Sequence, residues 1–230
     1  MAGPAPAGPS GGGSIAAESA LELVASIVRD RGLALVAGDS PPANSLVALL
    51  AMTSFLEARR PALALYARCR ASLPVSSAAV RRLSKRLYAV HLRSFEEQYQ
   101  LVNALPVILS ADYYRQRPLV IVFDDFVSNY FASPVSRHRV AGVSLVAEQL
   151  AVMKSLAATH NLRAVLATYL SRDGKPLLWR VFSRYVDRAV AVRLASESLE
   201  LARVEPSGAF GEAYSIDLSE VARRLEVEEH

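Results

Sequence analysis

An eight-residue segment of the sequence has part of the spacing of a phosphate-binding loop. Gly38 begins the segment and Ser45 ends it, as in the pattern G-x-x-x-x-G-K-[ST] between a strand and a helix. In that loop the backbone N–H groups and the lysine hold phosphates, and the hydroxyl holds magnesium. Ala43 replaces the second glycine, which restricts positive φ, and Asn44 replaces the charged lysine. We therefore expect weak or no binding of ATP and magnesium; the alternative is an ordinary strand–helix loop.

A second segment ends in carboxylates. The apolar run 119–123 is followed by Asp124 and Asp125. A strand of this kind, called Walker B, places an aspartate where it can hold magnesium beside bound phosphates. An apolar run followed by an acid is common at strand ends, so this segment gains weight from its position after the segment Gly38–Ser45.

Apolar patterns predict alternating strands and helices after residue 14. Residues 1–14 are rich in Gly, Pro and Ser, and we expect a disordered tail there. Continuously apolar runs of strand length indicate buried parallel strands, and a period near 3.6 residues indicates helices. The predicted helices span 15–29, 46–59, 78–87, 94–105 and 140–160, the predicted strands span 33–37, 61–66, 119–123, 163–168, 189–194, 199–204 and 213–216, and loops span 38–45 and 129–139.

This order of elements predicts an α/β fold. Strands that alternate with helices favour a mostly parallel central sheet flanked by helices. The last three predicted strands follow one another without a helix, so they add C-terminal antiparallel strands to the sheet. Residues 15–225 suit one domain, because single cores stop growing only near 250 to 300 residues.

The composition indicates a packed, mildly basic protein. The 230 residues are 52% hydrophobic and 21% charged, with a formal net charge of +4. The apolar runs are shorter than the roughly 20 residues of a membrane span, and no signal-peptide pattern begins the chain, so we expect no membrane and a cytoplasmic location. The lone Cys69 fits a reducing compartment and a place in the core. Of the basic residues 23 are arginines, which bind phosphate well, although a GC-rich genome would give the same bias.

The order of these segments resembles the RecA-like recombinase ATPases, and most closely the archaeal RadA branch and its paralogues. Residues 124–131 (DDFVSNYF) are similar to the family's Walker B segment, and residues 148–151 (EQLA) to part of the long helix after it. Residues 164–168 (AVLAT) are similar to its sensor strand, and residues 199–216 to its closing antiparallel hairpin. Together with the segment Gly38–Ser45, these likenesses extend over most of the chain.

The sequence departs from this family at three parts of the hydrolytic site. Besides the altered loop, residues 65–68 (LYAR) offer no carboxylate where the family has the acid that activates water, and Arg68 occupies that place. The sensor strand continues with Tyr169 and Leu170 instead of the family's Asn-Gln pair, and we expect no counterpart of the family's N-terminal DNA-binding domain. The resemblance therefore implies a pseudo-ATPase without catalytic residues. Its degenerate nucleotide site comprises Gly38, Ala43, Asn44, Ser45 and Asp124.

Two loops correspond to those that face DNA in the family. The first is residues 133–139, and the second, much shortened, is residues 171–176. Basic side chains there could track a phosphate backbone, and Tyr169 or Trp179 could stack a base. The alternatives are a solvated helix entrance for the first loop and a core position for Trp179. The candidate DNA-binding residues are Arg137, His138, Arg139, Arg172 and Lys175.

Three functions are compatible with these features. The first is a non-catalytic recombinase paralogue that assists homologous recombination and DNA repair by binding single-stranded DNA, a recombinase or another paralogue. The second is a structural RecA-like scaffold subunit of a hetero-oligomeric complex without direct DNA binding, and the third is a weak ATPase. The family joins its subunits with a Phe-x-x-Ala plug. The tetrad at residues 55–58 lies inside a predicted helix, where we expect Phe55 in the core, so we do not expect a homopolymer.

Overall fold

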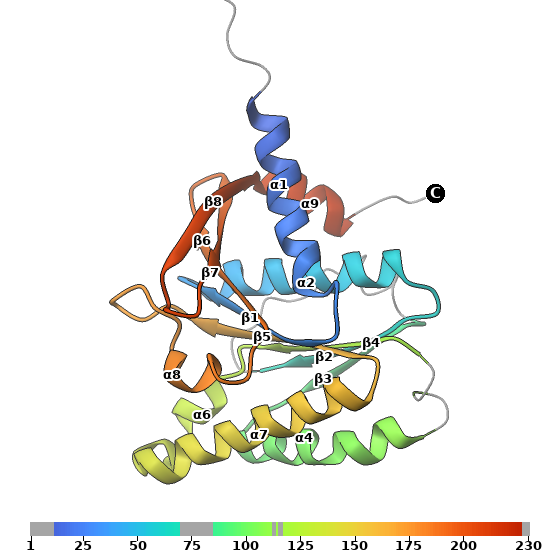
Figure 1. The fold of residues 1–230 in the computed structure, drawn as a ribbon, viewed down its shortest axis with the longest axis vertical. Coiled ribbons are helices and arrows are strands. Elements are labelled where there is room, and N and C mark those ends of the chain that lie inside the picture. The colour runs from blue at the N-terminus through green and yellow to red at the C-terminus, as the bar shows by residue number, and fades with distance from the viewer. Residues whose placement is uncertain (1–11, 70–84, 112–113, 115–116, 227–230) are drawn as a thin grey trace, which may run out of the picture.

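A computed structural model describes residues 12–69, 85–111, 114 and 117–226, which form one sheet with helices on both faces (Figure 1). Across the eight-stranded sheet the order is β3-β2-β4-β5-β1-β6-β7-β8. The strands from β3 to β6 in this order are parallel, whereas β7 runs antiparallel to β6, and β8 antiparallel to β7. This confirms the predicted α/β fold. The strands are β1 Gly32–Gly38, β2 Leu63–Arg68, β3 Leu87–His91, β4 Leu119–Asp124, β5 Leu162–Tyr169, β6 Arg188–Leu194, β7 Ser198–Val204 and β8 Phe210–Asp217.

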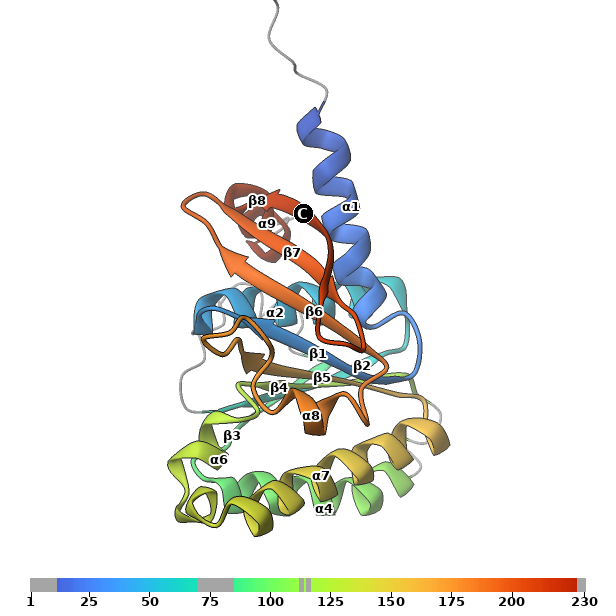
Figure 2. The same cartoon turned by 60° about the vertical axis from the view of Figure 1, so that its left-hand side comes forward.

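The helices form two layers. Helices α1, α2 and α9 lie on one face of the sheet, and α4 and α7 lie on the other, while the antiparallel strands β7 and β8 lie beside α1 (Figure 2). The helices are α1 Gly12–Ile27, α2 Pro41–Ala58, α4 Phe95–Ser110, α6 Ser128–Ala132, α7 Arg139–Thr159, α8 Trp179–Phe182 and α9 Leu218–Glu226, with a 3-10 helix η1 at Pro134–Arg137.

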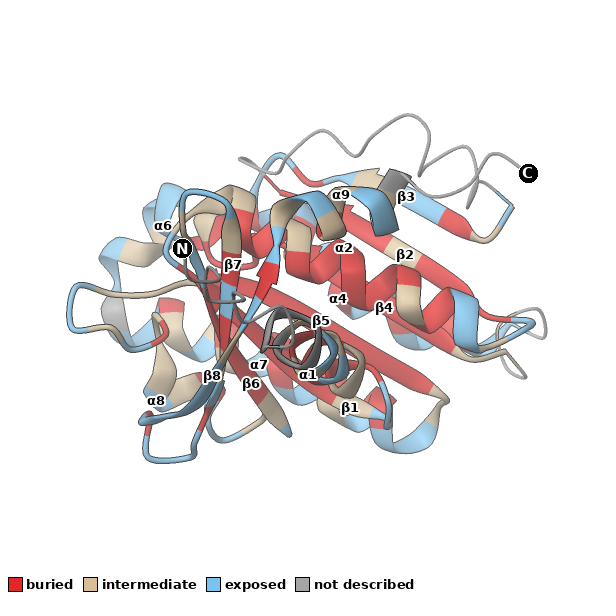
Figure 3. Cartoon of the chain, turned by 90° about the horizontal axis from the view of Figure 1, so that it is seen from above, coloured by how far each residue is buried: buried red, intermediate tan, exposed pale blue. Residues whose placement is uncertain are grey.

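Helix α2 is buried on almost every side, which matters because it carries part of the candidate nucleotide site. It packs on the sheet, with α1 on one side of it and α9 on the other (Figure 3). Its apolar residues show no helical periodicity, as expected for a helix that is apolar all round and enclosed by protein. Its buried residues are Ala43, Asn44, Ser45, Val47, Ala48, Leu49, Leu50, Ala51, Met52, Thr53, Phe55 and Leu56.

Several predicted element boundaries need correction. The predicted loop 129–139 contains α6 and η1, and α8, α9 and the edge strand β3 were not predicted. The predicted helix 78–87 falls mostly outside the described residues, and its last residue, Leu87, begins β3. Helix α1 begins at Gly12, so it includes the last three residues of the predicted tail; residues 1–11 lie outside the described part.

By length and composition, one described helix could cross a membrane. This is the segment Val140–Thr159 of α7, of which 39% is buried in the protein. Its inner side contacts β1, β5 and α4, and Val146, Leu150 and Met153 lie in the core. A core helix of this kind passes the same test, so the segment is weak evidence for a membrane span.

Candidate functional site

The turn between β1 and α2 is shorter than the predicted loop. Strand β1 ends at Gly38 and helix α2 begins at Pro41, so the predicted loop 38–45 and the predicted helix start at Leu46 are wrong. The physical reason is the pair Pro41 and Pro42, because proline at the first helical positions is preorganised for a helix. Ala43, Asn44 and Ser45 consequently lie in the first turns of α2, where all three are buried.

This turn offers few backbone donors to a phosphate. Pro41 and Pro42 have no N–H group, and the N–H of Asn44 donates to the carbonyl of Ser40 at 3.3 Å. The N–H of Asp39 donates to the carbonyl of Val192 at 3.2 Å. The Asp39 carboxylate accepts from the backbone of Leu194 at 3.3 Å and adds negative charge at the turn. A phosphate bound at this turn would therefore find few free N–H donors and would be repelled by the carboxylate of Asp39.

Asn44 fills the space behind the turn. Its side-chain amide donates to the carbonyl of Thr168 on β5 at 2.6 Å, and the residue is 1% exposed. Its Oδ1 atom lies over Gly38, where an added Cβ would come within 2.2 Å of it. Gly38 is thus required by the packing of Asn44. The hydroxyl of Thr168 and Oδ1 of Asn44 are buried without a hydrogen-bond partner among the described residues.

Asp124 is enclosed by hydroxyl groups from neighbouring elements. The hydroxyl of Ser45 lies 2.9 Å from both carboxylate oxygens, and the hydroxyl of Tyr66 on β2 donates to Oδ2. Burial, followed by the charge and hydrogen bond of Asp124, raises the pKa of Tyr66 far above its usual value of 10.0, so Tyr66 remains a donor. Ser45 and Asp124 stand at the positions predicted from the sequence for the two side chains that hold magnesium in a working P-loop site. Here they bind each other, and Asp124 is 1% exposed.

The second aspartate is also engaged. Asp125 has a positive φ of 69°, which turns its side chain so that Oδ1 accepts from the backbone of Ser128 at 3.2 Å. The hydroxyl of Tyr169 donates to Oδ2 at 2.7 Å. Burial and this hydrogen bond raise the pKa of Tyr169 above its usual value. The same hydrogen bond fixes the ring of Tyr169, so that it is not free to stack on a nucleic-acid base.

The end of β2 lies beside Asp124. Arg68 is the last residue of β2, pairs with Asp124 in the sheet register and has an exposed side chain. Cys69 follows it and is fully buried, as predicted for a core residue; burial, with the charges of Asp125 and Asp124, raises the pKa of its thiol. Within the described ranges, His, Cys, Asp and Glu form no cluster of three that could hold a metal ion.

The first predicted DNA loop is mostly helical. Ser133 caps η1 by accepting from the N–H of Val135 at 3.2 Å. Arg137 ends η1 and His138 follows it, and both side chains are exposed. Arg139 begins α7, and its side chain lies outside the described atoms. The segment is a helix entrance at which the exposed Arg137 could still meet a phosphate backbone.

The second predicted DNA loop is a tight turn. The hydroxyl of Ser171 donates to the carbonyl of Lys175 at 2.6 Å, and Gly174 adopts a φ of 80°. Arg172 and Lys175 are exposed, but Asp173 lies between them in the sequence. A hydrogen bond from the hydroxyl of Ser171 lowers the pKa of the Asp173 carboxyl below its usual value. Both loops follow the carboxyl ends of the neighbouring strands β4 and β5, on one side of the sheet (Figure 1).

Two aromatic residues from the sequence analysis are packed in the protein. Phe55 is 2% exposed within α2, so it lies in the core, as predicted, whereas Glu57 and Ala58 at the end of the tetrad are exposed. Trp179 is half-buried beside Gly208. Sequence reasoning missed a second Phe-x-x-Ala tetrad, Phe210 to Ala213 on the edge strand β8, although the same motif search would have found it. There Phe210 is 40% exposed.

Comparison with known proteins adds no relative: the chain matches no protein-family model and no curated protein.

Proposed function

We propose that this chain is a non-catalytic, RecA-like recombinase paralogue, a pseudo-ATPase that assists homologous recombination and DNA repair through single-stranded DNA or a recombinase partner. The observation that best supports a loss of ATPase activity is that Asp124 is hydrogen-bonded to Ser45 and Tyr66 of the same chain. The role in recombination and DNA repair rests on the resemblance in motif order. The contact between Ser45 and Asp124 supports that resemblance, because the motif requires these two side chains to meet.

ATP binding would have to undo several internal contacts. Magnesium would displace the hydroxyl of Tyr66 from Asp124, and the β-phosphate would displace Asn44 from the carbonyl of Thr168. Each buried polar group left without its partner costs about 1–3 kcal/mol. The turn offers no lysine and few N–H groups in return, so the balance opposes binding.

The experiment is a thermal unfolding series with ATP and magnesium. Millimolar ATP at a site of about 10 μM affinity would stabilise the folded state by about 2.7 kcal/mol, which a melting curve detects easily. We expect any shift caused by ATP and magnesium to be the same in the parent and in Asp124→Ala, because the site around Asp124 does not take part in it. A clear upward shift that Asp124→Ala abolishes would favour the weak ATPase instead.

The DNA arm of the proposal depends on Arg137, His138 and Arg139, with Arg172 and Lys175 on the neighbouring turn. Each single-strand phosphate contact releases about 0.7 of a counterion, so about three contacts give a salt slope near −2. We expect weak binding to an unstructured oligonucleotide, with a slope that flattens when Arg137 and Arg139 are both changed to Ala. Arg224→Ala, on α9, is the control with an unchanged slope. A double variant that binds with the parental slope would contradict this arm.

A scaffold without DNA contact is the second candidate, and exposed apolar residues favour it. Phe131 is 48% exposed and Val140 is 84% exposed, on either side of η1, while Phe210 begins the edge strand β8. Apolar side chains at such positions suit a protein partner. If Phe210→Ala prevents co-purification with a recombinase-type subunit while oligonucleotide binding is undetectable, the scaffold function replaces the first.

A further inference from the structure

Three arginines converge at the amino end of the parallel strands, on the side of the sheet opposite the turn after β1. Arg163 is the second residue of β5 and is paired with Gly32 of β1, so Arg31 lies directly before that pair. Arg59 follows the last residue of α2. Arg163 occupies a position on the α2 face of β5, since Val165, two residues on, belongs to the apolar core under α2.

Two of these arginine side chains make cation–π contacts with the same aromatic ring, that of Phe55. The guanidinium carbon of Arg59 lies 5.5 Å from the centre of the Phe55 ring, and that of Arg163 lies 5.3 Å from the same centre. Phe55 is 2% exposed and fixed in α2, so it holds both arginines at the end of the helix. Arg31 is exposed at the rim of the same region.

Arg163 is a buried cation without a matching anion. It is 4% exposed, and among the described residues its Nη1 donates to Asn161 alone, at 3.1 Å to the carbonyl and also to the side chain. Its Nε atom is buried without a hydrogen-bond partner, and no carboxylate in the described ranges forms an ion pair with it. Burial, and then the charges of Arg59 and Arg31, lower the pKa of Arg163 to about 10, against the opposing charge of Asp30.

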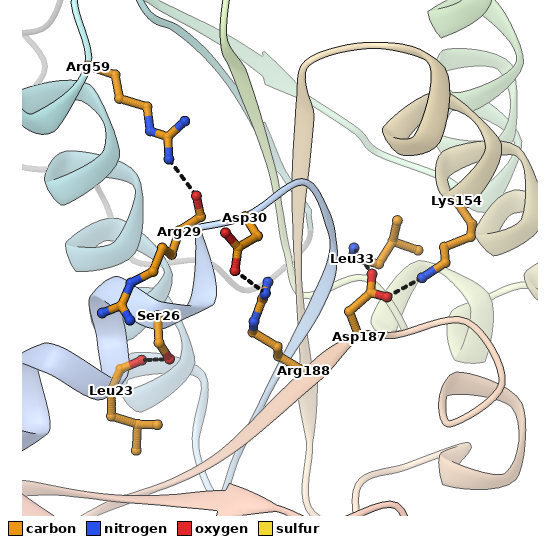
Figure 4. A network of polar contacts seen from close by, with 9 residues as sticks. All are labelled: Leu23, Ser26, Arg29, Asp30, Leu33, Arg59, Lys154, Asp187 and Arg188. Atoms are coloured by element: carbon orange, nitrogen blue, oxygen red, sulfur yellow. Dashed lines mark hydrogen bonds and ion pairs between the residues drawn. The ribbon is translucent and has the colours of Figure 1, made fainter.

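The acids nearby are bound to other cations. Asp30 pairs with Arg188, and Asp187 pairs with Lys154 and accepts from the N–H of Leu33 (Figure 4). The backbone carbonyl of Arg29 accepts from Arg59, which orients that guanidinium without neutralising it (Figure 4). Buried charges in folded proteins are normally paired, but Arg163 has no paired anion among the described residues, and Arg59 and Arg31 add two more positive charges beside it.

We propose that Arg31, Arg59 and Arg163 form a binding site for a phosphate group. Guanidinium groups bind phosphate in a bidentate geometry, and the rigid base of Phe55 and Asn161 keeps Arg163 in place before the ligand arrives. The phosphate could belong to a small polyanion or to a nucleic-acid backbone, since both present the same oxygens. This site is independent of the proposed function, because it lies at the other end of the strands from Arg137 and Asp124.

The test uses the full chain in a low-salt buffer without phosphate or sulfate, titrated with inorganic pyrophosphate and followed by thermal unfolding. The variants are Arg163→Met, and Arg31→Gln, whose exposed side chain leaves the fold unaffected. Arg193→Met, at the carboxyl end of β6, is the control of equal charge change. We expect pyrophosphate to raise the unfolding midpoint of the parent and the control, and each site variant to bind roughly tenfold or more weakly, as the loss of one charge-assisted contact predicts.

A second readout separates a ligand site from a structural arginine. Without anions, Arg163→Met is expected to unfold at the parental temperature or above it, because it removes an unpaired buried charge and keeps the apolar stem. Displacement of pyrophosphate by an unstructured oligothymidylate assigns the phosphate to nucleic acid, and no displacement assigns it to a small ligand. The proposal is overturned if the parent shows no pyrophosphate shift, or if Arg31→Gln and Arg163→Met both retain it.

Discussion

The hydroxyl of Tyr66 offers a direct way to measure how firmly the site around Asp124 is closed. Tyr66→Phe removes one oxygen atom and leaves the ring, which is 2% exposed, in the same packing. The carboxylate of Asp124 then keeps Ser45 and loses its donor from β2. The variant therefore isolates one hydrogen bond to a buried charge.

The expected cost follows from that geometry. Net hydrogen bonds to charged groups contribute about 1.5–3 kcal/mol, and burial prevents water from replacing the lost donor. We therefore expect Tyr66→Phe to lower the free energy of unfolding by about 2 kcal/mol at neutral pH. Tyr99→Phe is the matched control: its hydroxyl donates to Glu148 at 2.8 Å on the exposed side of α4, where the change stays within about 0.5 kcal/mol.

The assay is urea unfolding followed by circular dichroism, with the dependence on urea concentration compared between variants. An unchanged slope with a lower midpoint would locate the effect in the folded state. If Tyr66→Phe unfolds with the same free energy as the parent, the hydroxyl does not hold Asp124, and the site is more open than the structure indicates.

Three further predictions concern the same region. Because the folded-state pKa values of Tyr66 and Tyr169 are raised, their contribution to stability is complete below about pH 10 and declines as pH rises, by up to about 1.4 kcal/mol per pH unit for each tyrosine. Tyr169→Phe should reduce this decline when the free energy of unfolding is measured in urea at increasing pH, and an unaltered decline would contradict the prediction. Gly38→Ala should cost about 1–3 kcal/mol in urea unfolding because its Cβ meets Oδ1 of Asn44, and Asn44→Ala in the same chain should recover much of that loss; additive losses would show no contact. Ala43→Gly with Asn44→Lys should not restore turnover, because the two prolines of the turn still lack N–H donors; phosphate release above background would refute this.

The central strands could be predicted from the sequence because they are strongly apolar. Strand β4 is a continuous apolar run up to Asp124, and β5 contains one from Ala164 to Ala167, as expected for strands buried on both faces of a parallel sheet. Strand β3 lies at the sheet edge with a mostly exposed pattern, so its five residues carry no comparable signal. Helix α9 follows β8 directly, without a turn residue to mark its start.

The candidate site was predictable only in part. The motif order placed Ser45 near Asp124, but the loop pattern obscured the helix start that Pro41 and Pro42 signal. Tyr66 reaches Asp124 from a strand 58 residues away in sequence, a contact set by strand order and register and invisible to local patterns. The unpaired state of Arg163 likewise depends on what surrounds the start of β5 in space.

A crystal structure of the protein grown with magnesium and a non-hydrolysable ATP analogue would show whether the site around Asp124 is closed to nucleotides. We expect an empty turn after Gly38, Asn44 still bonded to the carbonyl of Thr168, and the hydroxyls of Ser45 and Tyr66 still bonded to Asp124. A triphosphate seated on residues 38–45, with magnesium between Ser45 and Asp124 and Tyr66 displaced, would contradict it.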